Sequence, residues 1–339
     1  MRISTNVRSV VIGVALLSLV AVVERASAQQ GTKVLKLGHA LTTDHPYQEG
    51  SLKLAELVAA KTSGRVKIEV FPNSQLGGER DMVEGLQIGT VDLVITAPSI
   101  AATIANERKV FLLDMPYIFT DYDALSRVLE SDIGHEMVKS FPKHGFRNIG
   151  WYIAGFHQLT NSKRPIVKPE DLRGLKMRMW QSKSATLMME ALGATVVPMS
   201  FPEVYTSLQQ GVIDGFANSL ATIYATKIYE VQKYVSLTNH MVSTLNMLIA
   251  ERVYQSLSPA DRKAIDEAGV EAARFQRGLY KVSDEKSLRL LREKNVAING
   301  NVDVEAFRKQ VEPYRAKFVE LVNEPGAKEL ADRIVKAGK

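Results

Sequence analysis

Arg178 is the residue whose type and position most favour ligand chemistry. In Leu175–Trp180, apolar side chains alternate with Lys176, Arg178 and Trp180, and this period of two predicts a strand. Strands of a covered parallel sheet are apolar on both faces, so a cationic row at the strand's end departs from the pattern. Open α/β sheets bind ligands beyond the carboxyl ends of their strands, and a guanidinium can bind a carboxylate with two parallel hydrogen bonds. We therefore predict that Arg178 binds an anion; the alternative is an exposed strand end with ordinary surface charge.

Two further positions near this strand are candidates. Asn218 follows Asp214 by four residues, where the next strand is expected to end, and its amide can donate to the same carboxylate. A turn-stabilising asparagine is the alternative. Phe201 and Tyr205 are four residues apart and share one face of a predicted helix. Such an aromatic pair is more often part of a core than of a ligand site.

A short internal echo indicates two related halves. Leu86–Asp92 and Leu208–Asp214 share the pattern Leu-Gln-x-Gly-x-x-Asp. Each copy is typical of a helix end, a glycine that stops the helix, and a strand that begins near the aspartate. The echo predicts two similar α/β lobes, although a single seven-residue match also arises by chance.

The first residues have the pattern of an export signal. Arg2 and Arg8 precede an apolar run over 10–23, and a small-x-small site ends at Ala28. This predicts a signal peptide over residues 1–28, cleaved after Ala28, and a periplasmic mature chain. An uncleaved anchor is the alternative, but the run is shorter than the ~20 residues that a membrane span needs.

Composition excludes several classes of protein. The mature chain has 40 basic and 36 acidic residues, with no basic cluster interleaved with aromatics, so we expect no nucleic-acid partner. The chain has no cysteine, hence no disulfide and no thiol nucleophile. It also lacks a G-x-S-x-G elbow and an H-E-x-x-H helix, and its six histidines have no metal-ligand spacing. We expect no enzyme, no cofactor and no metal.

Strands and helices alternate along the chain, which predicts an α/β fold. A helix is predicted over 223–235, and a long one begins at Ser258, a serine N-cap followed by proline, and runs to Lys294. No linker separates two domains. We therefore expect the chain to cross between its lobes more than once.

Several motifs, in order along the mature chain, resemble the substrate-binding subunits of tripartite ATP-independent (TRAP) transporters, the DctP family. They are Gly38–Ala40, Phe71–Gly77, Asp171–Arg178, Phe201–Tyr205, Asp214–Asn218, Tyr229–Tyr234 and Thr238–His240. The resemblance implies a two-lobe periplasmic binding protein (a Venus flytrap) with a hinged cleft and a long C-terminal helix region. We place the first lobe at 29–153 plus about 243–282, and the second at about 154–242 plus 283–339. It also implies capture of a small organic acid and its delivery to a sodium-coupled membrane permease.

The family's carboxylate-binding arginine and asparagine correspond to Arg178 and Asn218, and its ligand-packing aromatic to Phe201. Sialic-acid binders have a second arginine where this chain has His157, and an acidic residue where it has 97–99. The first departure argues against sialic acid, and the second implies that the amino-group recognition of those proteins is absent here. A neutral histidine at 157 fits either a hydroxyl or keto oxygen of the ligand, or a structural role.

His39, Gln75 and Trp180 are further predicted cleft residues. We expect a monomer. A periplasmic sensor that presents an organic acid to a membrane receptor is the alternative function, because it needs the same cleft. The sequence does not distinguish among C4-dicarboxylates, 2-oxo acids, sugar acids and aromatic acids.

Overall fold

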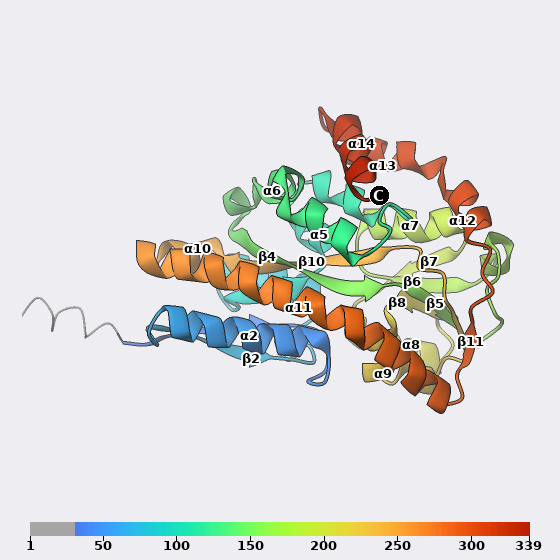
Figure 1. The fold of residues 1–339 in the computed structure, drawn as a ribbon, viewed down its shortest axis with the longest axis horizontal. Coiled ribbons are helices and arrows are strands. Elements are labelled where there is room, and N and C mark those ends of the chain that lie inside the picture. Colours follow the sequence, from blue (N-terminus) through green and yellow to red (C-terminus); the bar gives the residue numbers. More distant parts are fainter. Residues whose placement is uncertain (1–30) are drawn as a thin grey trace, which may run out of the picture.

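A computed structural model describes residues 31–339, with Lys281 by its backbone alone. The predicted signal peptide lies outside the described residues. Two β-sheets form the framework, one of five strands in the order β2-β1-β3-β10-β4 and one of six in the order β11-β9-β5-β8-β6-β7 (Figure 1). We call each sheet with its helices the first and the second lobe. The predicted α/β class is what the structure has.

The strands of the first lobe are β1 (Lys33–Gly38), β2 (Val66–Phe71), β3 (Leu93–Thr96), β4 (Phe146–Phe156) and β10 (Val242–Ala250). Those of the second are β5 (Gln158–Asn161), β6 (Lys176–Met179), β7 (Thr195–Pro198), β8 (Gly215–Asn218), β9 (Tyr234–Ser236) and β11 (Ala297–Asn299).

The helices up to β4 are α2 (Pro46–Lys61), α3 (Glu79–Ile88), α4 (Pro98–Ala105), α5 (Tyr122–Glu130) and α6 (Asp132–Val138), with 3₁₀ turns η1 (Lys109–Asp114) and η2 (Phe141–His144). The next are η3 (Pro169–Leu172), α7 (Lys183–Leu192), η4 (Phe201–Glu203), α8 (Val204–Gln209), α9 (Leu220–Ala225) and η5 (Ile228–Glu230). The last are α10 (Glu251–Gln255), α11 (Pro259–Glu293), α12 (Val304–Val311), α13 (Tyr314–Val322) and α14 (Ala327–Ala337).

The internal echo has the same structural role in both lobes. The Asp92 carboxylate accepts the backbone N–H of Lys36 at 3.0 Å, and that of Asp214 accepts the N–H of Lys176 at 2.9 Å. Each aspartate thereby ties the start of one parallel strand to its neighbour, β3 to β1 and β8 to β6. The repeated sequence therefore marks equivalent positions in the two sheets.

One predicted element is wrong. The helix expected over 223–235 is instead α9, η5 and strand β9. Lys227 adopts a left-handed conformation (φ 56°), which ends the helical run, and β9 pairs with β5 and β11. Sheet pairing here overrides a local helical pattern.

The chain crosses between the sheets at three places. His157 joins β4 to β5, the segment 237–241 joins β9 to β10, and α11 (orange in Figure 1) runs beside α2 and on to α9. Gly155, beside the first crossing, has φ +79°, and a Cβ there would lie 2.7 Å from Ser219 Cβ and 2.8 Å from the Tyr280 ring. Only glycine suits this close approach.

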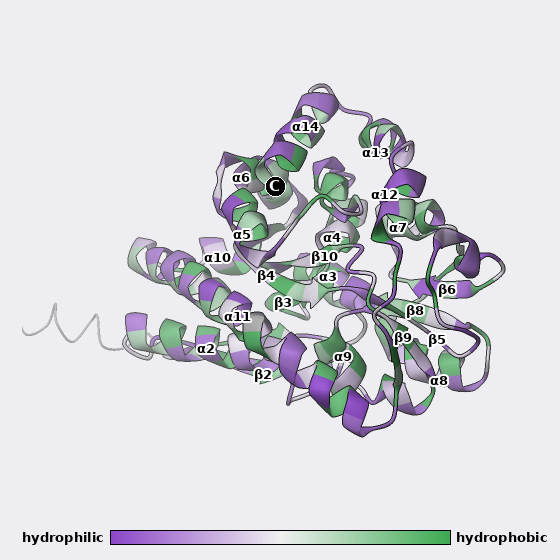
Figure 2. Cartoon of the chain, turned by 45° about the vertical axis from the view of Figure 1, so that its right-hand side comes forward, coloured by the Kyte–Doolittle hydropathy of each residue, from purple (hydrophilic) through white to green (hydrophobic). Residues whose placement is uncertain are grey.

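The C-terminal helices contact both lobes. α12 and α13 pack on α7, whereas α14 packs on α5, α6 and η1. The exact lobe boundaries therefore stay a prediction. Surface helices such as α11 and α14 mix hydrophilic and hydrophobic residues along their length (Figure 2). Over residues 31–339, no helix combines the length and apolar character needed to cross a membrane.

Candidate functional site

The loops that follow equivalent strands of the two lobes meet each other. After β3 and β6, the Trp180 indole N–H donates to Ser99 Oγ at 2.9 Å. After β2 and β7, a Cβ added at Gly78 would lie 2.5 Å from Ser200 Oγ. The carboxyl ends of the parallel strands thus face one another across the boundary between lobes, which is where open α/β sheets bind ligands.

Arg178 lies on β6 in this boundary and is only 4% exposed. Its Nε and Nη2 donate to the Met199 carbonyl at 3.1 and 2.8 Å, and its guanidinium carbon lies 5.5 Å from the centre of the Phe201 ring. Within residues 31–339, Arg178 has no carboxylate at ion-pair distance. Burial lowers its pKa to about 10, against the opposing effect of Glu79 and Glu203. A buried guanidinium with no carboxylate at ion-pair distance favours the binding of an anion.

Glu79, the first residue of α3, is the acidic group that most strongly opposes the lowering of the Arg178 pKa. Its Oε2 accepts from Thr96 Oγ1 at 2.9 Å and from the Ala97 N–H at 2.8 Å. Burial raises the pKa of Glu79, whereas these two donors and Arg178 lower it. The sequence analysis did not identify Glu79, because an acidic residue in the first turn of a helix is ordinary.

His157 lies at the first crossing and is 2% exposed. Its ring is 6.0 Å from the Trp180 ring and 6.2 Å from the His240 ring, centre to centre, and neither of its ring nitrogens has a hydrogen-bond partner. Burial, then His240 and Arg178, hold the pKa of His157 well below 6.5. His240 was not predicted as a site residue, although it ends the motif Thr238–His240.

The remaining predicted residues differ in their surroundings. Asn218 ends β8 opposite Gln158, and its Oδ1 accepts the N–H of Ser219 at 2.9 Å, the turn-stabilising bond. The His39 ring is fully engaged, since Nε2 pairs with Gln48 Oε1 at 2.8 Å and Nδ1 accepts the Leu41 N–H at 3.3 Å. Burial lowers the pKa of His39 to about 4.

Gln75 is exposed in the loop after β2. The structure therefore brings together Arg178, Phe201, His157 and Trp180, with Asn218 on the neighbouring strand. Gln75 stays a prediction, in a loop whose Gly78 lies against Ser200 of the second lobe.

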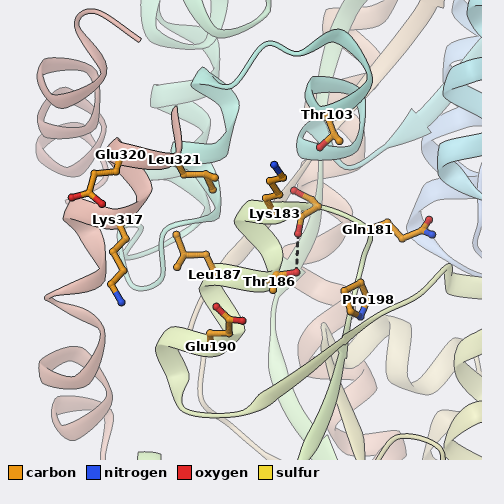
Figure 3. A pocket seen from close by; sticks show the side chains of 11 residues that line it. Thr103, Gln181, Lys183, Thr186, Leu187, Glu190, Pro198, Lys317, Glu320 and Leu321 are labelled. Atoms are coloured by element: carbon orange, nitrogen blue, oxygen red, sulfur yellow. Dashed lines mark hydrogen bonds between the residues drawn. The ribbon is translucent and has the colours of Figure 1, made fainter. Parts of the chain in front are cut away.

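A separate groove of about 730 Å³ lies between α4, α7 and α13. In Figure 3, Leu187 of α7 and Leu321 of α13 lie between the two helices, whereas Lys183 and Lys317 point away from each other. None of the seven predicted site residues lines it. In the part of the chain that the structure describes, no group of three or more His, Asp or Glu side chains is placed to bind a metal.

Comparison with known proteins gives a consistent result. Residues 37–321 match the family described as "Bacterial extracellular solute-binding protein, family 7". The C4-dicarboxylate-binding periplasmic protein DctP of Rhodobacter capsulatus is 34% identical over 264 residues, 77% of this chain and 78% of that protein.

Two solved structures are similar over nearly their whole length. A TRAP periplasmic solute-binding protein from Polaromonas sp. JS666, bound to D-erythronate, has a TM-score of 0.85 and 33% identity. The match covers 89% of this chain and 98% of the Polaromonas chain. One from Roseobacter denitrificans, with bound L-galactonate, has a TM-score of 0.78 and 34% identity. The match covers 87% of this chain and 99% of the Roseobacter chain.

Proposed function

Because the chain belongs to family 7 of the bacterial extracellular solute-binding proteins, we propose that it captures a small organic acid by its carboxylate in the periplasm and delivers it to a sodium-coupled TRAP permease. The chain is a TRAP-type solute-binding protein of a family that binds organic acids, and not an enzyme. The periplasmic location, the permease and the residues that hold the acid belong to the proposal.

The observation that supports it most strongly is the buried, unpaired guanidinium of Arg178. Two of its nitrogens, Nε and Nη2, are fixed by the Met199 carbonyl, so the planar group is oriented before the ligand arrives. A carboxylate is the natural partner, because it accepts parallel N–H bonds and neutralises the charge.

The neighbouring residues suit the same ligand. Phe201 lies against the guanidinium and limits its access to water. The amide of Asn218 retains its two N–H donors, since the bond to Ser219 uses only Oδ1. In this account, Arg178 and Asn218 of the second lobe hold the carboxylate, and contacts from the first lobe favour closure around it.

A thermal-shift screen of residues 29–339 tests the function. Small organic acids are compared with neutral analogues of the same carbon skeleton, since a ligand that binds the folded state raises the unfolding midpoint by mass action. We expect shifts with one class of carboxylates only. A response to neutral compounds with none to acids would overturn the proposal.

A further inference from the structure

Each of the two strand crossings carries one buried histidine, and the two crossings are bonded to each other. The His157 N–H donates to the Met241 carbonyl at 2.8 Å, and the Gln158 amide donates to Asn239 Oδ1 at 2.6 Å. His157 and His240 thereby lie side by side at the base of the boundary between lobes, with ring centres 6.2 Å apart. The Trp180 ring lies 6.0 Å from the His157 ring, centre to centre, which places the pair next to the strand that carries Arg178.

Three ring nitrogens of this pair have no partner within the described chain: both of His157 and Nε2 of His240. His240 Nδ1 pairs with Thr238 Oγ1 at 2.8 Å. Buried polar atoms are nearly always hydrogen-bonded, because leaving them unpaired costs free energy.

Two other buried histidines of the same chain serve as an internal comparison. Both ring nitrogens of His39 are engaged, and so are those of His45, with Thr222 Oγ1 at 3.1 Å and the Tyr47 N–H at 3.2 Å. Among these four buried histidines, the unmet hydrogen-bonding capacity is confined to the pair beside Arg178, and there it points to polar groups of a ligand.

The charges around the pair decide which polar groups fit. Burial, the neighbouring ring and Arg178 hold the pKa of His157 well below 6.5, and burial lowers that of His240 to about 3. Both rings are thus neutral: His157 offers one donor and one acceptor, whereas His240 offers only Nε2, because its Nδ1 pairs with Thr238. A hydroxyl, which both donates and accepts, matches such a ring, whereas a carboxylate accepts only.

Among the buried side chains that the structure describes, Arg178 is the only cation without a carboxylate at ion-pair distance. Among buried side chains of residues 31–339 the cations are Arg178 and Arg277, and Arg277 is paired with Glu130. Glu79 and Glu203 both act on Arg178, and Oε1 of Glu79 has no hydrogen bond within the described residues. It would repel a second carboxylate and accept from a hydroxyl.

We propose that His157 and His240 form an uncharged subsite that hydrogen-bonds hydroxyl groups of the ligand, so that the protein selects polyhydroxylated monocarboxylates and rejects dicarboxylates. The proposal rests on the proposed function, since Arg178 takes the single carboxylate.

Matched ligands test this selection by titration calorimetry on residues 29–339. One set is D-erythronate, butyrate and succinate, and the other is D-galactonate, hexanoate and adipate. We expect the hydroxylated member of at least one set to bind at least about 100-fold more tightly than its two partners, as for sites built to hydrogen-bond a hydroxyl. A dicarboxylate that binds as tightly as the hydroxy acid overturns the subsite but leaves the proposed function standing. No binding by any of the six acids overturns the subsite, whereas the proposed function is overturned only if the thermal-shift screen finds no acid that binds.

Variants of His157 test whether this residue causes the preference for hydroxy acids. His157→Phe keeps a planar ring without nitrogens and should weaken the hydroxy acid by about 10-fold or more, with no change for its unsubstituted analogue. His157→Gln restores a donor and an acceptor and should recover part of the loss. Arg178→Ala, by contrast, should weaken all carboxylates alike. Equal losses for both acids in His157→Phe would refute the subsite.

If His157→Phe does not fold, nuclear magnetic resonance of the wild-type protein tests the same proposal. The ring nitrogens of His157 and His240 should shift when the hydroxy acid binds, whereas those of His39 should not. Unchanged ring signals at saturating ligand would contradict the proposal.

Discussion

Replacing Arg178 by methionine separates a ligand-binding arginine from a structural one. The change removes the guanidinium but retains an unbranched apolar chain. We expect ligand affinity to fall by about 2–5 kcal/mol, the cost of truncating one partner of a buried charge pair. Stability without ligand should change far less. Burial lowers the pKa of Arg178 to about 10, which corresponds to a cost of about 3 kcal/mol to the charged form. The two bonds to the Met199 carbonyl return about the same amount.

Calorimetry with the best acid from the screen measures the affinity, and denaturant unfolding of the ligand-free protein measures the stability. The free energy of unfolding should stay within about 2 kcal/mol of wild type. Arg178→Lys is the matched control, because it keeps a positive charge but not the planar fork, and it should also lose much of the affinity. Unchanged affinity in Arg178→Met, or a large stability loss with affinity retained, would refute the reasoning.

Three further predictions concern stability, each measured by denaturant unfolding without ligand. Ser184→Ala should lower the free energy of unfolding by about 1–3 kcal/mol, because Ser184 Oγ donates to the buried Asp114 carboxylate at 2.5 Å between α7 and η1. An unchanged free energy of unfolding would show that this bond does not stabilise the fold. Gly155→Ala should cost about 1–3 kcal/mol more than Gly64→Ala, since both residues have positive φ but only Gly155 has atoms within 4 Å of an added Cβ; equal costs would exclude the close approach. Stability should fall as the pH drops below about 6.5, because four buried histidines stay neutral in the fold while the unfolded chain takes up protons. They are His39, His45, His157 and His240, all with lowered pKa values. Asp114 and Asp284, whose pKa values burial raises to about 6, bind protons in the folded state between pH ~4 and ~6 and offset about half of this. The net loss should be about 1–3 kcal/mol per pH unit between pH 6 and 5, and a gain would contradict it.

The sequence predicted those parts of the site that depend on local pattern. Alternation in Leu175–Trp180 identified the strand of Arg178, because a cation at a strand's carboxyl end is conspicuous. The echo around Asp92 and Asp214 predicted related lobes, since each aspartate binds the neighbouring strand of its own sheet.

What depends on packing between distant segments was not predictable. Glu79 looks ordinary in sequence and His240 only ends a family motif, and the meeting of the two lobes brings them near Arg178 and His157. His39, next to a strand end, looked like a ligand residue, yet Gln48 and the Leu41 backbone engage its ring. The helix predicted over 223–235 was wrong for the same reason, because β9 pairs with β5 and β11, which are far away in the chain.

The most direct test of carboxylate capture is titration calorimetry of the wild-type protein with its best acid and with the primary amide of that acid. The amide keeps the skeleton and hydroxyls but removes the charge that Arg178 is proposed to neutralise. We predict that the amide binds more weakly by about 2–5 kcal/mol. Equal affinity for the acid and its amide would contradict the account.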